Sequence, residues 1–122
     1  MIVTKLHYHR KSKLLDVVFD NDIQHSFSAE FLRVNSPSAE VQGHGNAVLV
    51  TNKKEVAITS IEQVGHYAVR IIFDDGHNTG LYSWDYLANL AKNHDALWQS
   101  YLSQLKMKKA TREPLIPIQI KH

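Results

Sequence analysis

The stretch Tyr67-Ala68-Val69-Arg70-Ile71-Ile72-Phe73-Asp74-Asp75-Gly76-His77 decides the fold class. Its first seven residues are apolar or aromatic apart from Arg70, a composition typical of a strand. Asp75-Gly76 then predicts a tight hairpin turn, because glycine accepts the positive φ angles that such turns need. After the turn, residues 78–82 return as a short strand. The sequence therefore predicts an antiparallel hairpin in the second half of the chain.

Further strands are predicted on the N-terminal side of this hairpin. The turn signal Asp20-Asn21-Asp22 separates two of them, because Asp and Asn bond readily to nearby backbone. Residues 23–27 alternate apolar and polar side chains, as a half-buried strand does. The first three runs form a plausible antiparallel meander. The predicted strands are residues 2–9, 14–19, 23–27 and 56–61.

Helical signals occupy two other parts of the chain. Ser28 can cap a short helix over residues 28–33, which Asn35-Ser36-Pro37-Ser38 ends, because the residue before proline avoids helical geometry. Residues 34–50 are then irregular and predict a long loop. Ser83 caps a C-terminal helical region, and residues 93–95 look like a break followed by a new cap.

Together these signals predict an α+β domain. It has a mainly antiparallel sheet of about five or six strands, one short helix and a C-terminal helix or helix pair. One domain is expected over residues 1–107, followed by a mobile, basic and proline-containing tail over residues 108–122. Trp84 and Trp98 lie on apolar helical stripes, which places them in the core.

The composition excludes several kinds of protein. The chain has 122 residues, 43% hydrophobic residues, no cysteine and a net charge of +2. Without cysteine, the chain has no disulfides, thiolate metal sites or thiol nucleophiles. The net charge is too small to indicate nucleic-acid binding. No segment has the apolar length of a membrane span or the pattern of a secretory signal, so a cytoplasmic location is expected. An exposed sheet edge would allow a homodimer.

One combination of residues carries the elements of a hydrolytic triad. Ser36, His77 and either Asp74 or Asp75 supply a hydroxyl, a base and a carboxylate. No nucleophile elbow surrounds Ser36, however, and the two aspartates already belong to the turn. A solvated turn is the favoured interpretation, with a small enzyme using Ser36 and His77 as an alternative.

Two histidine-containing segments are candidate ligand or metal sites. His7 and His9 lie two residues apart on a predicted strand, so they face the same side, but no third ligand is evident. Gly43-His44-Gly45 lacks the spacing of a phosphate loop, and a flexible connector is the favoured interpretation. A metal-handling accessory that uses histidines therefore remains an alternative function.

Two longer stretches carry a family resemblance. Phe31-Leu32-Arg33-Val34-Asn35-Ser36-Pro37-Ser38-Ala39-Glu40-Val41 is the first, and residues 69–87, from Val69 to Leu87, are the second. Their order and separation resemble the γ-butyrobetaine hydroxylase-like N-terminal domain, a family also called DUF971. The resemblance covers roughly the first 105 residues and implies a stand-alone member of that family.

The resemblance also implies a specific difference at a zinc site. In the hydroxylase this domain holds a structural zinc with three cysteines and a histidine. The cysteine positions fall on Ser36, Ser38 and Val41, and the histidine falls on His77. Serine hydroxyls are poor zinc ligands and valine is none, so His77 is the only ligand position retained and no cofactor is predicted. Ser36 and Ser38 are instead expected to hydrogen-bond with His77 or with backbone.

The expected function follows from these observations. The hydroxylase's separate oxygenase domain has no counterpart in a chain of this length, so hydroxylase activity is not expected. Related domains fused to P-loop iron–sulfur carriers imply, as a second possibility, an accessory role near iron or iron–sulfur proteins. The leading hypothesis is a non-enzymatic binding or accessory domain with an unknown protein partner. Its candidate binding surface combines the 34–50 loop with the His77 hairpin, through Arg33, Asn35, Ser36, Ser38, His44 and His77.

Overall fold

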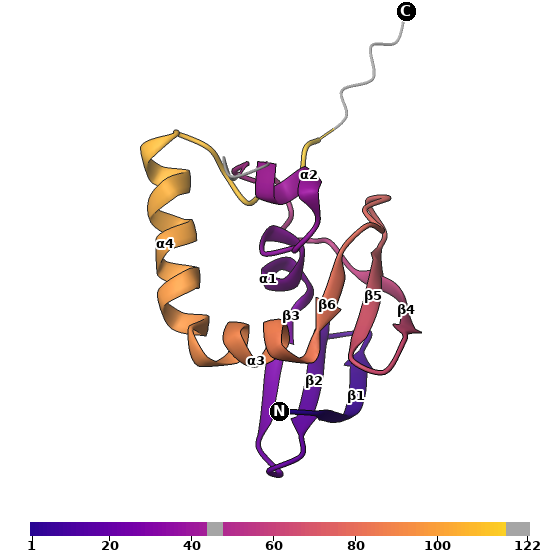
Figure 1. Cartoon of the computed structure of the whole chain (residues 1–122). Helices are drawn as coiled ribbons and strands as arrows, with labels where there is room; N and C mark the ends of the chain where they lie inside the picture. The colour runs from indigo at the N-terminus through magenta and orange to yellow at the C-terminus, as the bar shows by residue number, and fades with distance from the viewer. Residues whose placement is uncertain (44–47, 117–122) are drawn as a thin grey trace, which may run out of the picture.

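The chain folds as an α+β domain with six antiparallel strands and four helices in the described part, residues 1–43 and 48–116 of a computed structural model (Figure 1). This confirms the predicted fold class. The strands divide between two three-stranded sheets rather than forming one. The strands are β1 (Val3–His9), β2 (Leu14–Phe19), β3 (Gln24–Ser28), β4 (Ile58–Val64), β5 (Ala68–Phe73) and β6 (Leu81–Ser83). The helices are α1 (Ala29–Val34), α2 (Ala39–Gln42), α3 (Trp84–Lys92) and α4 (His94–Met107).

The first sheet is the predicted meander, in the order β1-β2-β3. Alternate residues of β2 are buried. The residues that pair with them on β1 and β3 lie on the same face of the sheet, so this face packs on the core. His7 and His9 lie on the other face with their rings stacked at 4.3 Å, as their spacing predicted. His9 Nε2 lies 2.7 Å from the carboxylate of Asp16 on β2.

The second sheet, in the order β4-β5-β6, contains the predicted hairpin. The Asp75-Gly76 turn forms as expected, with Gly76 at a φ of +91°. The return strand is shorter and later than predicted, because residues 78–80 form no strand and β6 pairs only with Ala68 to Arg70. The two sheets contact each other through Tyr8, whose hydroxyl accepts a hydrogen bond from Ile58 N.

The helices cover the core with their apolar faces. Ser28 caps α1 by accepting from Phe31 N at 3.0 Å, and Ser83 caps α3 by accepting from Tyr86 N at 3.0 Å. Asn93 separates α3 from α4, so the C-terminal region is the predicted helix pair. The largest fully buried side chains are Tyr82, Phe19, Phe27, Phe31 and Phe73. Within the described residues, no helix is both long and apolar enough to cross a membrane.

The segment after α4 folds back onto the domain. Thr111 O and Arg112 O accept hydrogen bonds from Asn52 N and Lys54 N, each at 2.9 Å. Arg112 also forms a two-pronged ion pair with the buried Glu30. A mobile tail from residue 108 was predicted, but residues 111–113 are anchored. The basic composition of this segment predicted a solvated end. Its anchoring was not predicted because Glu30, the buried carboxylate that binds Arg112, is 82 residues earlier in the sequence. Residues 117–122 lie outside the described residues.

Candidate functional site

Two chain segments bring the predicted site residues together. Asn35 ends α1, and residues 36–38 then form an extended turn that leads into α2. His77 follows the Asp75-Gly76 turn, and its backbone N–H donates to Asp75 Oδ1 at 3.1 Å. The local turn chemistry of both segments therefore orients Ser36 and His77 toward each other.

The buried His77 lies at the centre of a polar cluster. Its Nε2 lies 2.8 Å from Ser36 Oγ and 3.4 Å from Ser38 Oγ. Its Nδ1 lies 3.3 Å from Glu40 Oε2, on the first turn of α2. The expected hydrogen bonds between the serines and His77 are thus present. We call Ser36, Ser38, Glu40 and His77 the histidine cluster.

Three members of the histidine cluster are closed to solvent, whereas the Glu40 side chain is exposed. Ser36 is fully buried, and the His77 side chain is only 3% exposed. Backbone at Gly80 covers the Ser36 hydroxyl so closely that a Cβ there would lie 2.6 Å from Oγ. Tyr82 is buried beside it and donates its hydroxyl proton to Leu32 O. Ser36, Ser38 and His77 therefore support the predicted surface from beneath and are not themselves exposed on it.

A charged network borders the histidine cluster. Asp75 Oδ2 pairs with Arg33 Nε at 2.8 Å and with Lys53 Nζ at 2.7 Å. Burial alone would raise the pKa of Asp75, but hydrogen bonds from Lys53, the His77 N–H and Arg33 lower it to about 2. Arg33 thus links the end of α1 to the hairpin turn. One of its terminal nitrogens, Nη1, is buried with no hydrogen-bond partner among the described residues.

The geometry changes the carboxylate of the triad that was kept as an alternative. The carboxylate at His77 Nδ1 belongs to Glu40, whereas Asp75 binds Arg33 and Lys53. Sequence reasoning missed Glu40 because α2 lies inside a segment that was predicted to be irregular. Ser36, His77 and Glu40 do follow the order of nucleophile, base and acid. A fully buried Ser36 gives a substrate carbon no access to Oγ, so this arrangement does not support acyl transfer.

Of the remaining predicted residues, the structure describes Asn35, which directly precedes Ser36 of the cluster. Asn35 is partly buried, and its carbonyl accepts a hydrogen bond from the Tyr86 hydroxyl at 2.6 Å. Gln42 donates from Nε2 to Ser36 O at 3.0 Å, a contact that the sequence did not indicate. His44 lies outside the described residues.

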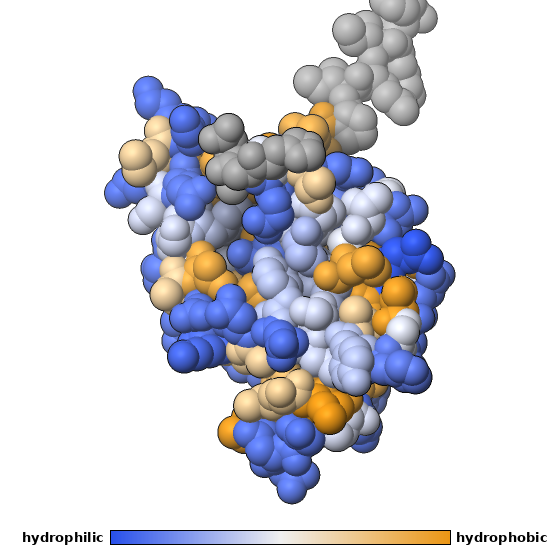
Figure 2. Space-filling model, viewed as in Figure 1, coloured by the Kyte–Doolittle hydropathy of each residue, from blue (hydrophilic) through white to orange (hydrophobic). Residues whose placement is uncertain are grey.

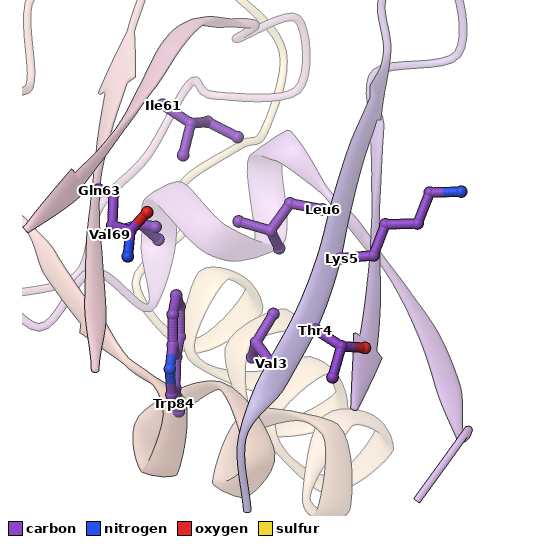
Figure 3. A pocket seen from close by; sticks show the side chains of 8 residues that line it. All are labelled: Val3, Thr4, Lys5, Leu6, Ile61, Gln63, Val69 and Trp84. Carbon is purple, nitrogen blue, oxygen red and sulfur yellow. The ribbon is translucent and has the colours of Figure 1, made fainter. Parts of the chain in front are cut away.

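Two cavities lie outside the histidine cluster. One, of about 270 Å³, lies between residues of the ranges 34–43 and 48–50 and the helices α3 and α4. The other, of about 390 Å³, lies between the edge strands β1 and β4 and is remote from the predicted residues (Figure 3). In Figure 3, Leu6 and Val3 face Ile61, Val69 and Trp84 across this second cavity, while Lys5 points away from it.

Comparison with known proteins places the chain in a family. The family model described as "Gamma-butyrobetaine hydroxylase-like, N-terminal" matches residues 6–88. The chain belongs to this family. No curated protein matches it.

Solved structures of similar proteins share the fold of this γ-butyrobetaine hydroxylase-like domain. Two are NMR solution structures with TM-scores of 0.82, at 56% and 44% sequence identity. The alignment with the first covers 99% of this chain and 92% of that protein. The alignment with the second covers 96% of this chain and 94% of that protein. A third is the crystal structure of a DUF971-family protein of unknown function from Acidithiobacillus ferrooxidans. It has 32% identity and a TM-score of 0.63, over 73% of this chain and 91% of that one.

The residues of the γ-butyrobetaine hydroxylase-like domain do not fit the zinc site that the resemblance implies. Two of the four positions carry serine hydroxyls, one carries Val41, and His77 Nε2 already has Ser36 as a partner. Across residues 1–43 and 48–116, no group of three or more His, Cys, Asp or Glu side chains is arranged to hold a metal ion. The hydrogen bonds of the histidine cluster join the loop to the hairpin at these positions.

The buried histidines predict a loss of stability in mild acid. Burial lowers the pKa of His77, and the nearby Arg33 lowers it further, against the opposing attraction of Glu40 and Asp75. Burial also lowers the pKa of His25, with His94 adding to the effect. The unfolded chain therefore takes up protons near pH 6.5 at sites where the folded chain does not. We expect these histidines to leave the unfolding free energy unchanged above that pH and to reduce it as the pH falls below it.

Urea denaturation at a series of pH values checks this expectation. The variant His77→Gln lacks one of the two groups with a lowered pKa. Its stability should therefore depend less steeply on pH than that of the parent as the pH falls below about 6.5. Equal slopes for both proteins would show that His77 is not held neutral by the fold.

Proposed function

We propose that this domain is a non-enzymatic module that binds a protein partner through the cavity beside the histidine cluster. The carrying observation is that described residues of the predicted working region, within 34–43 and 48–50, form one wall of this cavity while α3 and α4 form the other. We call it the loop cavity. Its lining residues are Val34, Asn35, Val41, Gln42, Val48, Leu49, Val50, Tyr86, Leu97, Ser100, Tyr101 and Gln104.

Hydrogen bonds between the two walls support a preformed site. The Tyr101 hydroxyl on α4 donates to Val50 O at 2.7 Å, and the Tyr86 hydroxyl on α3 donates to Asn35 O at 2.6 Å. Burial raises the pKa of Tyr101 to about 12, so its hydroxyl remains a donor at neutral pH. A cavity whose walls are fixed before binding loses little conformational entropy on association.

The lining indicates the kind of group that enters. None of the lining side chains carries a charge at neutral pH, and half of them are aliphatic. The exposed Gln104 and Ser100 add an amide and a hydroxyl at the rim. This pattern suits an uncharged apolar side chain of a partner whose backbone bonds to the rim, the usual anatomy of a binding hot spot.

Composition supports the setting of this interaction. A chain without cysteine fits a reducing compartment, so we place the partner in the cytoplasm. A net charge of +2 gives no basic footprint, so we favour protein over nucleic acid as the partner. The sealed Ser36 argues against catalysis as the alternative.

Photo-crosslinking in the source cells tests the proposal. A benzophenone amino acid replaces Ser100 at the rim of the loop cavity, or Gln99, an exposed neighbour that is not among the lining residues. A discrete protein adduct is expected from position 100 and not from position 99. The substitution Gln104→Trp fills the cavity mouth and should abolish the adduct. Gln99→Trp, the same change on the same helix, should preserve it.

Binding of the identified protein must then follow the same pattern in purified form. Calorimetry should show a loss of affinity of roughly tenfold or more for Gln104→Trp, because a blocked hot-spot cavity costs about 1.4 kcal/mol or more. An adduct that forms equally from positions 99 and 100, or that survives Gln104→Trp, would contradict the proposal.

A further inference from the structure

The cavity of Figure 3 lies between two sheet edges, β1 and β4, to which no further strand is added in the described part of the chain. It is lined by residues 3–6 of β1, Ile61 and Gln63 of β4, Val69 of β5 and Trp84 of α3. Figure 2 shows exposed hydrophobic side chains over the second sheet and beside the start of β1. We call this space the edge cavity.

The backbone of β1 forms part of the wall of the edge cavity. Lys5 lines the cavity although its side chain points away from it, so its main chain contributes to the wall. Phe19 N donates to Ile23 O, so the main-chain polar groups of alternate β2 residues, Val17 included, face β3. Leu6 pairs in register with Val17 and therefore turns its N–H and C=O away from β2, toward the open edge.

β4 presents its main chain to the same space. Trp84 N donates to Tyr67 O, so the main-chain groups of Tyr67 and of every second residue after it face β6. The intervening β5 residues face β4, where Glu62 pairs with one of them. Ile61 and Gln63, on either side of Glu62, therefore turn their N–H and C=O toward the open edge.

The two edges are bridged at one end of the edge cavity. There Ile58 N donates to the Tyr8 hydroxyl at 3.0 Å, but no main-chain hydrogen bond joins β1 to β4 within the described residues. Outward main-chain groups on an edge strand are the groups that pair with an additional extended chain. The groups at Leu6, Ile61 and Gln63 therefore favour a peptide main chain as the occupant.

The side chains of the edge cavity indicate which peptide fits. Leu6 and Val3 face Ile61, Val69 and Trp84 across the space (Figure 3). In an extended peptide every second side chain points to the same face. Apolar residues at alternate positions would therefore enter between these walls, and the intervening residues would lie on the outer face.

The outer face beside β1 carries a positive charge. Lys5 is exposed and has no ion-pair partner within the described residues, whereas Arg70 on β5 is paired with Glu62 at 2.6 Å. Opposite charges on neighbouring strands attract when they lie side by side. An acidic residue between the apolar residues of the peptide would therefore complement Lys5.

We propose that the edge cavity binds an extended segment of a partner protein as an additional strand on β1. The main chain of the segment pairs with the β1 edge, its alternate apolar side chains enter the cavity, and an acidic side chain lies beside Lys5. β4 stands where the next strand of an incoming sheet would lie, so the space accepts a single segment. This site is separate from the loop cavity and does not depend on the function proposed for it.

Hydrogen exchange of the ¹⁵N-labelled full chain tests the proposal, with the capped peptide acetyl-Thr-Val-Glu-Val-Glu-Val-Thr-amide as the probe. The peptide should slow exchange at the Leu6 amide, which faces the open edge, and leave His7, which faces β2, unchanged. The same peptide N-methylated at its central residues should bind at least tenfold more weakly, because it keeps the side chains but loses main-chain donors. Equal binding of the two peptides would overturn strand addition.

Two pairs of variants locate the peptide. Ile61→Glu puts a charge in the edge cavity and should weaken binding roughly tenfold, whereas Gln24→Glu, at an exposed position on β3, should not. The parent should prefer the glutamate peptide to its lysine counterpart by roughly threefold. Lys5→Glu should reverse this preference, and Lys11→Glu, in the exposed turn after β1, should preserve it.

Three outcomes would overturn the proposal. One is the absence of saturable binding by the glutamate peptide. Another is a charge preference that Lys5→Glu does not reverse, a test at an exposed position that does not require Ile61→Glu to fold. The third is slowing of Leu6 exchange with rising protein concentration in the absence of peptide, which would show that a second copy of the chain occupies the edge.

Discussion

Replacement of Arg112 by alanine is expected to lower the unfolding free energy by about 2–3 kcal/mol. The Glu30 carboxylate is buried, with its side chain 6% exposed, and Arg112 binds both of its oxygens, at 2.8 and 2.7 Å. Without the guanidinium, a buried charge loses its partner, which costs about 3–5 kcal/mol when solvent cannot reach it. The Arg112 side chain is 34% exposed, so water can replace it in part and the lower value is expected.

Urea denaturation of a small variant set checks this value. Arg112→Lys keeps the charge but loses the paired hydrogen bonds and the stacking on Trp98, whose ring centre lies 5.0 Å from the guanidinium, so it should fall between the parent and Arg112→Ala. Lys109→Ala, at a neighbouring exposed position, should change stability by less than about 0.5 kcal/mol. A double-mutant cycle with Glu30→Gln should show strong coupling. If Arg112→Ala matched Lys109→Ala, the anchored segment would contribute nothing to stability.

Replacement of His77 by alanine should destabilise the domain by about 3 kcal/mol. The substitution leaves a cavity at a buried position and removes the ring nitrogen that lies 2.8 Å from Ser36 Oγ. Ser36 is fully buried, so bulk water cannot readily replace that bond. The loss therefore combines a packing cost with the cost of an unsatisfied hydroxyl.

Two comparisons make the His77 result specific. His66→Ala removes an exposed imidazole and should change stability by less than about 0.5 kcal/mol. In the Ser36→Ala background, His77→Ala should cost less than in the parent, because the hydroxyl that it leaves unpaired is gone. Tight, stoichiometric zinc binding that His77→Ala abolishes would instead show that His77 acts as a metal ligand.

The local elements were predictable because their signals are local. The Asp75-Gly76 turn and the serine caps depend on neighbours within four residues, and each formed where the sequence indicated. The predicted break at Asn93 also depends on such neighbours. The division of the strands into two sheets was not predictable, because a short-range pattern specifies a strand and its turn but not the edge at which a sheet stops.

The candidate site was predictable only in part, for a related reason. The resemblance paired Ser36 and Ser38 with His77, and the structure shows them in contact. Backbone at Gly80 packs against the Ser36 hydroxyl with no room for a Cβ, a contact that no pattern of apolar residues reveals. From the sequence, Glu30 is an acidic residue in the first turn of a helix, a position that is favourable in solvent. Its burial is explained by the ion pair with Arg112, which is distant in the sequence.

The order of the strands has a consequence for how the chain folds. Each sheet consists of consecutive strands joined by turns, so every strand pairing can form between neighbouring segments with a small loss of chain entropy. The contacts that join the two halves, such as Tyr8 with Ile58 and Ser36 with His77, span about 40 to 50 residues. We therefore expect the two meanders to form early and to dock onto each other in a slower step. Partial opening of the native domain should then begin at the contacts between the two halves.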